Sequence, residues 1–260
     1  MGEHLLVSIQ NGRADITLNR PDMHNAFDEV MIADLTTLLK ALEINDAVRV
    51  VVLSGAGKSF SAGGDLNWMK RFANYSFEQN IEDAQALAEL MRTLHELKKP
   101  TIACVHGNAY GGGVGLVACC DIAVATKAAA FCLSEVKLGL IPAVISPYVI
   151  AAMGARAARR YFLTAERFDA AEAFRLGLVH ELVETEEQLD KAVERLVASL
   201  RQNGPQAIQA SKELIRAVGQ RPISQEVRQD TAKRIAERRA SHEGAEGVAA
   251  FLEKRKPSWQ

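Results

Sequence analysis

The chain has no long hydrophobic run and almost no net charge, and each absence excludes a class of function. No window of about eighteen residues is both apolar and free of charged side chains, so the sequence predicts no membrane-spanning helix. The formal net charge is −1, which leaves no global field to attract nucleic acid or an acidic membrane. The first residues lack a basic region followed by an apolar stretch, so we expect no secretory signal and a cytoplasmic location.

Cysteine is scarce, and several familiar motifs are missing. The four cysteines lie in apolar runs without Cys-x-x-Cys spacing, which predicts buried free thiols in a reducing compartment rather than disulfides or a zinc site. The histidines have no partner at metal-ligand spacing, so we expect no metal. Glycine-rich fingerprints for nucleotide phosphates are absent, and Ser134 lacks the Gly-x-Ser-x-Gly context of a nucleophile.

The sequence does contain an ordinary globular core, with 48% hydrophobic and 24% charged residues among 260. Asn11 and Gly12 separate two alternating segments and predict a hairpin. Periodicity then predicts strands and helices in alternation: a helix at 27–42, a strand at 48–53, a helix at 77–97, a strand at 101–106, a short helix at 114–120 and a strand at 121–125. This alternation is typical of an α/β fold with substantial parallel pairing.

From about residue 151 the pattern becomes mostly helical. Only residues 178–183 look like a strand in this half. The helical patterns are 156–163, 170–176, 186–202, 204–218, 224–240 and 244–254. We therefore predict an α/β body over residues 1–195 and a helical region over residues 196–260.

Two glycine-rich turns, residues 60–65 and 107–115, are the most informative feature. Each follows a predicted strand and leads into a helix. Backbone N–H groups at such a junction are unpaired and favour negative charge, so two facing turns could hold one oxygen as an oxyanion hole. The alternative is a pair of tight structural connections, because glycine readily adopts positive φ.

One carboxylate, Glu135, lies in the apolar segment 131–142. Its neighbours Phe131, Leu133 and Val136 would remove water from it and raise its pKa toward a range useful for general acid–base catalysis. The alternative is a carboxylate that is exposed or forms an ion pair, for which Lys137 is a candidate.

Several segments together resemble the enoyl-CoA hydratase/isomerase family, also called crotonases. They are LNRPDMHNAF (18–27), FSAGGDL (60–66), PTIACVHGNAYGGGVGL (100–116), CDIAVA (120–125), LGLIP (138–142) and FLEKRKP (251–257). The resemblance implies a crotonase-like spiral core of repeated strand–strand–helix units and a helical C-terminal trimerisation region. It also implies a homotrimer or dimer of trimers that acts on acyl-CoA thioesters, with CoA as part of the substrate and no separate cofactor.

The same resemblance assigns the catalytic residues. The oxyanion donors fall on Gly64 and Gly112, and one catalytic glutamate falls on Glu135. Many hydratases of the family carry a second glutamate where this chain has Gly115. The chain departs from the pattern there, so double-bond isomerisation by one carboxylate and hydration by one carboxylate both stay open. We expect Gly115 to leave space for a branched substituent on C3 of the substrate.

The resemblance also implies which residues contact substrate and CoA. They are His24, Asn25, Ala26, Ala62, Gly63, Asp65, Leu66, Tyr110, Gly111, Pro142, Phe251 and Lys254. The last two are expected to reach CoA from a C-terminal helix, often that of a neighbouring subunit. The alternatives are a helix cap for Asp65, and a core phenylalanine with a surface lysine for the last two.

Three further segments resemble the bacterial methylglutaconyl-CoA hydratase branch, which acts in leucine breakdown. They are DLNWMK (65–70), CLSEVKLGLIPAVISPYV (132–149) and ARRYFLTAERFD (158–169). That branch converts 3-methylglutaconyl-CoA to 3-hydroxy-3-methylglutaryl-CoA. The distal carboxylate of this substrate needs a partner, for which Lys70, Arg71 and Tyr148 are candidates. The alternatives are an enoyl-CoA isomerase and an acyl-CoA-binding oligomer with weakened catalysis.

Overall fold

The computed structural model describes residues 3–219 and 221–260, and its main sheet has six strands in the order β1-β2-β3-β5-β7-β10. The strands β1 and β2 form the predicted antiparallel hairpin, and every later pairing in this sheet is parallel. The six strands are β1 (Leu5–Gln10), β2 (Arg13–Leu18), β3 (Val50–Gly55), β5 (Thr101–Val105), β7 (Ile122–Thr126) and β10 (Glu181–Val183).

A second sheet of four very short strands carries the segments on which function was predicted. These strands are β4 (Ser59–Ser61), β6 (Asn108–Tyr110), β8 (Ala130–Cys132) and β9 (Phe168–Asp169). The first three pair in parallel, and β9 is antiparallel to β8. The periodicity analysis missed all four, because strands of two or three residues are too short to show an alternating pattern.

The chain repeats a strand–strand–helix unit. In each unit a strand of the main sheet is followed by a strand of the small sheet and then by a helix, as in β3–β4–α2, β5–β6–α4 and β7–β8–α5. The helices of the body are α1 (Glu29–Glu43), α2 (Leu66–Phe72), α3 (Phe77–Glu96), α4 (Gly112–Cys119), α5 (Ser146–Thr164), α6 (Ala170–Leu176) and α7 (Glu186–Gln202). This repetition confirms the predicted α/β spiral of strand–strand–helix units.

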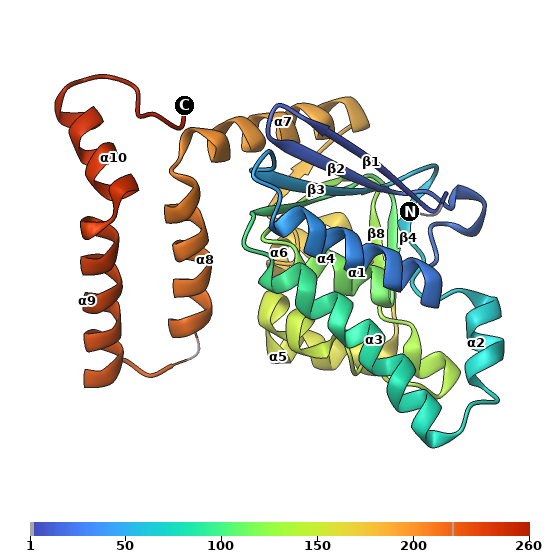
Figure 1. Cartoon of the computed structure of the whole chain (residues 1–260). Helices are drawn as coiled ribbons and strands as arrows, with labels where there is room; N and C mark the ends of the chain where they lie inside the picture. The colour runs from blue at the N-terminus through green and yellow to red at the C-terminus, as the bar shows by residue number, and fades with distance from the viewer. Residues whose placement is uncertain (1–2, 220) are drawn as a thin grey trace.

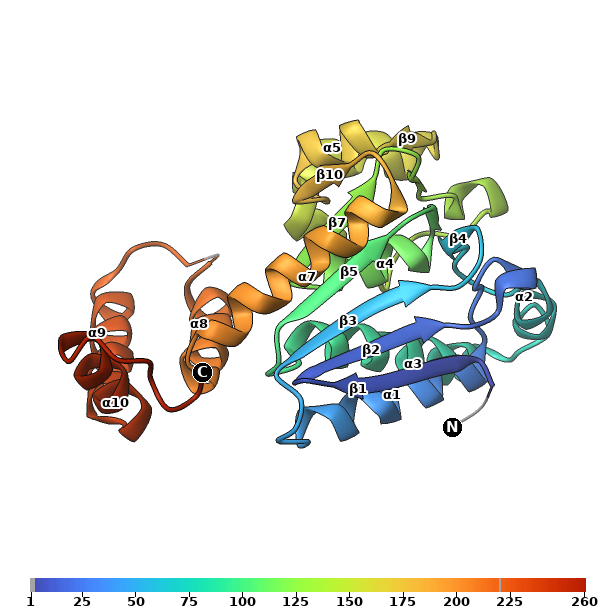
Figure 2. The ribbon, with the colours of Figure 1, turned by 90° about the horizontal axis from the view of Figure 1, so that it is seen from above.

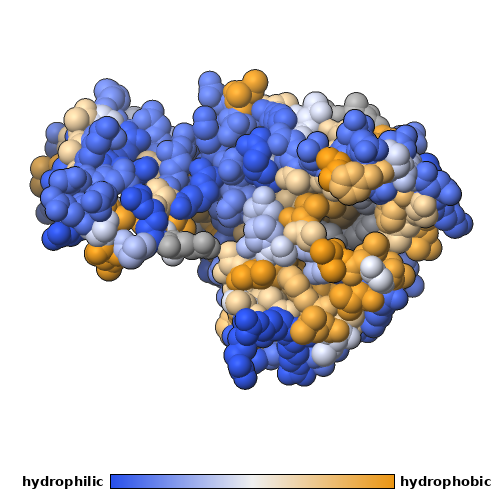
Figure 3. All heavy atoms as spheres, turned by 90° about the horizontal axis from the view of Figure 1, so that it is seen from below, coloured by the Kyte–Doolittle hydropathy of each residue, from blue (hydrophilic) through white to orange (hydrophobic). Residues whose placement is uncertain are grey.

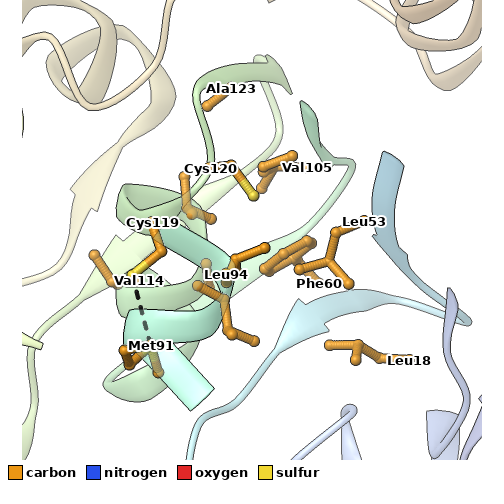
Figure 4. Close-up of a cluster of buried hydrophobic side chains, with 14 of the residues drawn as sticks. Leu18, Leu53, Phe60, Met91, Leu94, Val105, Val114, Cys119, Cys120 and Ala123 are labelled. Carbon is orange, nitrogen blue, oxygen red and sulfur yellow. Dashed lines mark hydrogen bonds between the residues drawn. The ribbon is translucent and has the colours of Figure 1, made fainter. Parts of the chain in front are cut away.

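Both faces of the main sheet are covered, which explains why its strands are continuously apolar. Figure 2 shows α7 crossing one face, with α1 and α3 beyond the other. The larger core joins strand residues such as Leu53 to Leu94 of α3 and Val114 of α4, as Figure 4 shows. The smaller core packs alternate residues of the same strands, such as Val52, against Val193 of α7.

The four cysteines are buried free thiols, as the sequence predicts, and Cys119 contacts Met91 inside the larger core. Among the described residues, no helix is long and apolar enough to cross a membrane. A search of the same residues finds no cluster of metal-ligating side chains.

Three C-terminal helices form an arm that projects from the body: α8 (Pro205–Val218), α9 (Gln225–Ala240) and α10 (His242–Leu252). Figures 1 and 2 both place α9 and α10 on the far side of α8 from the sheets. The arm exposes large apolar side chains, including Ile215, Val248 and Phe251. The boundary at residue 195 stays a prediction; α7 runs through it without a break, and the projecting helices begin ten residues later, at Pro205.

Candidate active site

The two glycine turns lie side by side, because the strands that precede them are neighbours in the small sheet. Ser61 of β4 is in register with Ala109 of β6. Gly63 follows, with a φ of +81°, and a Cβ added there would lie 2.7 Å from the carbonyl oxygen of Tyr110 and 3.2 Å from the nitrogen of Gly112. Only glycine permits both this backbone conformation and this approach of the two chains.

A short parallel bridge to Phe27 fixes the direction of the N–H group of Gly64. The amide of Phe27 donates to the carbonyl of Gly63 at 2.8 Å, and the amide of Asp65 donates to the carbonyl of Phe27 at 3.0 Å. Because N–H groups alternate in direction along extended chain, the Gly64 N–H points to the side opposite Phe27. It is therefore free to donate to a ligand.

The second predicted donor, Gly112, is the first residue of α4. Its N–H has no acceptor within the helix, because the first turn of a helix leaves its donors unpaired. The preceding Gly111 has a φ of +50°, and its own N–H donates to the carbonyl of Cys132 at 2.8 Å. The helix dipole adds partial positive charge at this terminus, which suits an oxyanion.

Glu135 reaches the same place from the neighbouring strand. It follows β8, whose Cys132 is in register with Tyr110 of β6. A Cβ added to Gly111 would lie 3.2 Å from Oε1 of Glu135, so the carboxylate lies beside the second glycine turn. Its Oε2 atom is buried and has no hydrogen-bond partner among the residues that the structure describes. The predicted alternative, an ion pair with Lys137, is not found in that part of the chain, and Lys137 is exposed.

The surroundings of Glu135 suit proton transfer. Burial raises its pKa above the ordinary value of 4.5, and the hydrogen bond to its own backbone amide opposes that rise only in part. A buried polar atom without a partner costs about 1–3 kcal/mol, and such atoms are rare unless they await a ligand or a water. The carboxylate is thus held partly dehydrated beside two free backbone donors.

The expectation of open space at Gly115 is wrong. Gly115 is buried in α4, and a Cβ there would lie 2.2 Å from Cγ2 of Ile145 and 3.3 Å from Cε of Met91. Ile145, the residue before α5, is itself 3% exposed and fills the place. The glycine therefore allows α4 and the start of α5 to pack closely, and it leaves no room for a second glutamate or a substrate branch.

Two of the residues whose backbone is predicted to line CoA direct their side chains into the protein. Asn25 is fully buried at a φ of +55°, and its amide nitrogen donates to the carbonyls of Ala56 and Ser59 at 2.8 and 2.7 Å. Asp65 is 2% exposed, accepts the amide of Asn67 at 2.7 Å as the cap of α2, and accepts Nη2 of Arg20 at 2.8 Å. The helix-cap interpretation of Asp65 is confirmed.

The other predicted contacts near the turns differ in exposure. His24 and Leu66 are exposed, Tyr110 and Ala62 are half-buried, and Pro142 is buried. The amide of Ala62 donates to the carbonyl of His24 at 2.9 Å, which ties the first loop to the first glycine turn.

Figure 3 shows apolar side chains gathered on the body, in contrast with the largely hydrophilic arm.

Phe251 and Lys254 are not brought to the glycine turns of their own chain. Phe251 belongs to α10 and is 83% exposed, so it is not the core residue that the alternative interpretation required. Lys254 follows that helix and is also exposed. Figures 1 and 2 both show α10 at the far end of the arm from β4, and Figure 1 shows the same for β8.

The three candidates for binding a distal carboxylate lie on two elements, Lys70 and Arg71 on α2 and Tyr148 on α5. Arg71 is paired with Glu29 at 2.6 Å, and Lys70 is exposed. Tyr148 lies against His95, with ring centroids 5.1 Å apart, and lines a cavity of about 720 Å³ that also includes Lys212. The residues around this cavity do not include Glu135 or either glycine donor.

The sequence-based interpretation missed two residues that shape the site. Ile145 was seen only as part of a family-like segment, and nothing in the sequence pairs it with Gly115. Phe27 was assigned to a helix, whereas it precedes the Asp28 cap of α1 and its ring contacts Gly112. No periodic signal separates Phe27 from the predicted helix, because Phe27 continues the apolar spacing of Val30 and Met31.

The comparisons with known proteins agree with this geometry. The family model for enoyl-CoA hydratase/isomerase matches residues 8–260. The chain belongs to this family. It is 32% identical to 2,3-dehydroadipyl-CoA hydratase of Escherichia coli over 264 residues, covering 98% of each chain. It is 30% identical to crotonyl-CoA hydratase of Syntrophomonas wolfei, covering 99% of this chain and 98% of the relative.

A solved enoyl-CoA hydratase from Shewanella pealeana has the same fold. The TM-score is 0.96 at 49% sequence identity, covering 98% of this chain and 96% of that one. Together with the family match, these relatives support a hydratase-type lyase that acts on acyl-CoA thioesters.

Proposed function

We propose that this enzyme adds water across the α,β double bond of an acyl-CoA thioester, with Glu135 as its only catalytic carboxylate. The single observation that carries the proposal is the buried Oε2 of Glu135, which has no partner among the described residues and lies beside the glycine turns that present the N–H groups of Gly64 and Gly112. In hydration, charge develops on the thioester oxygen while a proton moves near C2 and C3. The N–H groups of Gly64 and Gly112 can stabilise that charge, and Glu135 can move that proton.

The proposed reaction proceeds through an enolate. Glu135 removes a proton from water as the water oxygen bonds to C3, and the electron pair of the double bond moves toward the thioester oxygen. Gly64 and Gly112 donate hydrogen bonds to that oxygen. The enolate then collapses as C2 takes the proton back from Glu135, so that one water is added and the carboxylate is regenerated. A donor of this kind contributes about 2.7–4 kcal/mol to transition-state stabilisation.

For the acyl group we propose 3-methylglutaconyl-CoA, converted to 3-hydroxy-3-methylglutaryl-CoA in leucine breakdown. The support is the resemblance of three segments of the sequence to that branch, and the name of the Escherichia coli relative places a dehydroadipyl thioester among substrates of the family. The packing of Ile145 against Gly115 removes the argument that Gly115 accommodates the 3-methyl group.

Two other functions remain candidates for specific reasons. The lack of a carboxylate at position 115 favours an enoyl-CoA isomerase, in which Glu135 alone moves a proton between C2 and C4. The same lack favours an acyl-CoA-binding oligomer with weakened catalysis.

We further propose a homotrimer or a dimer of trimers, in which Phe251 and Lys254 contact the CoA bound to a neighbouring copy. The support is the projecting arm, which keeps both residues exposed and distant from the glycine turns of their own chain. We propose no cofactor besides the CoA of the substrate.

The test of the acyl group is the ratio of specificity constants for 3-methylglutaconyl-CoA and crotonyl-CoA. We expect the branched dicarboxylic thioester to be preferred by at least about tenfold, the equivalent of about 1.4 kcal/mol. Faster turnover of crotonyl-CoA would overturn the assignment of the acyl group but not that of hydration. A shifted double bond with no added water would instead identify an isomerase.

A further inference from the structure

Trp68 packs beside Gly64, the first oxyanion donor. It is the third residue of α2, is 5% exposed, and is one of two tryptophans in the chain. A Cβ added to Gly64 would lie 3.4 Å from Cζ3 and 3.5 Å from Cε3 of the indole, which is ordinary van der Waals contact. The indole therefore lies next to the position that a Cβ of Gly64 would occupy, beside Cε of Met69, which lies 3.1 Å from that position.

Phe27 connects this support to the second donor. Its ring centroid lies 6.4 Å from that of Trp68, and a Cβ added to Gly112 would lie 2.3 Å from Cζ of Phe27. The two rings thus form a continuous aromatic bridge, which we call the Phe27–Trp68 bridge, from Gly64 to Gly112. Because close-packed rings resist compression, the bridge fixes how far apart the two donors lie.

Asp83 fixes the orientation of the indole. Its Oδ1 accepts the Nε1–H of Trp68 at 2.9 Å, which joins α2 to α3. The other side-chain link from α2 to a neighbouring helix that the structure gives is the ion pair of Arg71 with Glu29, and both of those side chains are more than 40% exposed. Exposed ion pairs contribute little, so the half-buried Trp68–Asp83 hydrogen bond is the stronger of these two links.

We propose that Trp68, oriented by Asp83, is a positioning residue that sets the geometry of the oxyanion hole through Gly64 and Phe27. Its effect is exerted on the donors and not on the CoA portion of the substrate. The inference rests on the proposed function, because it assumes that Gly64 and Gly112 hold the thioester oxygen. Loss of a whole donor costs about 10²–10³ in kcat, so a displaced donor should cost about tenfold or more.

The variants are Trp68→Phe, Asp83→Leu and Asp83→Asn. Phenylalanine lacks the indole N–H and part of the ring, leucine removes the acceptor, and asparagine keeps a carbonyl oxygen that can accept the same hydrogen bond. Trp259→Phe is the matched control for the loss of a tryptophan, since Trp259 lies in the tail and donates to the carbonyl of Gln202. Glu82→Leu, at the exposed neighbouring position, is the control for Asp83→Leu.

The kinetic readout is kcat at saturating enoyl-CoA together with the dissociation constant of free CoA. We expect kcat to fall about tenfold or more in Trp68→Phe and Asp83→Leu, with CoA affinity unchanged within twofold. Asp83→Asn should keep kcat within about threefold of the wild type, and both controls should match the wild type. A merely structural role predicts a different pattern, in which CoA affinity and thermal stability fall together with kcat.

A binding readout separates this inference from the proposed function. Acetoacetyl-CoA forms an enolate whose charge lies partly on the thioester oxygen, so an oxyanion hole raises the bound enolate fraction, measured by its ultraviolet absorbance. We expect wild-type enzyme to stabilise the enolate and Trp68→Phe and Asp83→Leu to lose about tenfold of that stabilisation. A wild type that neither stabilises the enolate nor hydrates enoyl-CoA refutes the proposed function and the inference with it. Normal enolate stabilisation and kcat in Trp68→Phe, in an active enzyme, overturn the inference alone.

Discussion

At the scale of single residues, one carboxylate and two backbone N–H groups carry the proposed chemistry. Glu135 is useful because it is incompletely solvated, with one oxygen lacking a partner among the described residues. The same feature weakens the fold, since a buried unpaired group costs free energy that packing elsewhere has to offset.

Glu135→Gln should lose at least about a hundredfold in kcat, because glutamine keeps the shape of the side chain but cannot exchange a proton. Asp65→Asn is not a suitable control, since Asp65 holds α2; Glu82→Gln changes an exposed carboxylate and should be neutral. A Glu135→Gln enzyme with near-normal turnover would remove Glu135 from the mechanism.

The pH dependence should report the raised pKa of Glu135. As a general base it has to be ionised, so kcat/KM should rise with pH along an acid limb whose midpoint lies above 4.5. Stability should change in the opposite sense. Between the unfolded and the folded pKa the folded state binds the proton more tightly, so the free energy of unfolding falls as pH rises through that window.

Glu135→Gln should remove this fall in stability. Denaturant unfolding of both proteins at several pH values measures it, and parallel pH dependence in the two would contradict the assignment of the shifted pKa to Glu135.

At the scale of elements, the sequence predicts most of the long helices and the central strands, but it misses α2, residues 146–155 of α5 and the small sheet. The helix at 170–176 and the helix at 186–202 agree with α6 and α7 residue for residue, because amphipathic periodicity is strong over several turns. In contrast, the strands β4, β6 and β8 can be recognised only from their pairing in the structure, and not from the sequence. These strands bring the two glycine turns and Glu135 together. The identity of the site residues could be predicted from motifs, whereas their packing could not.

The contact of α4 with the start of α5 gives a prediction for Gly115. Gly115→Ala places a methyl group 2.2 Å from Ile145 Cγ2, so it should destabilise the protein by about 1–3 kcal/mol through overpacking. Gly115→Ala should cost less stability when added to Ile145→Ala than when added to the wild type, because the two changes share one space. Urea unfolding measures the free energy of unfolding of each variant. If Gly115→Ala alone is as stable as the wild type, the start of α5 shifts without cost to accept the methyl group.

At the scale of the whole molecule, the arm is the part whose function one copy of the chain does not explain. Phe251 and Lys254 lie on it, exposed and away from the site. The sequence predicts the arm's helices from periodicity, but which surface covers their apolar side chains depends on other copies of the chain, which no local pattern records.

If the arm serves a neighbouring copy, Phe251→Ala with Lys254→Ala should raise KM for the acyl-CoA about tenfold with little change in kcat. Removal of residues 244–260 should weaken CoA binding at least as much. Lys256→Ala, a change at a nearby exposed lysine, is the control. Light scattering that finds a stable monomer, with full CoA affinity after the truncation, would rule out both the oligomer and the shared site.

Hydration by Glu135 can be tested by the mass of the product that wild type and Glu135→Gln form from an α,β-unsaturated acyl-CoA. We expect wild-type enzyme to add the mass of one water, with label from H₂¹⁸O on C3, and the variant to form this product at least about a hundredfold more slowly. A product of unchanged mass, or equal rates of water addition by the two proteins, would contradict it.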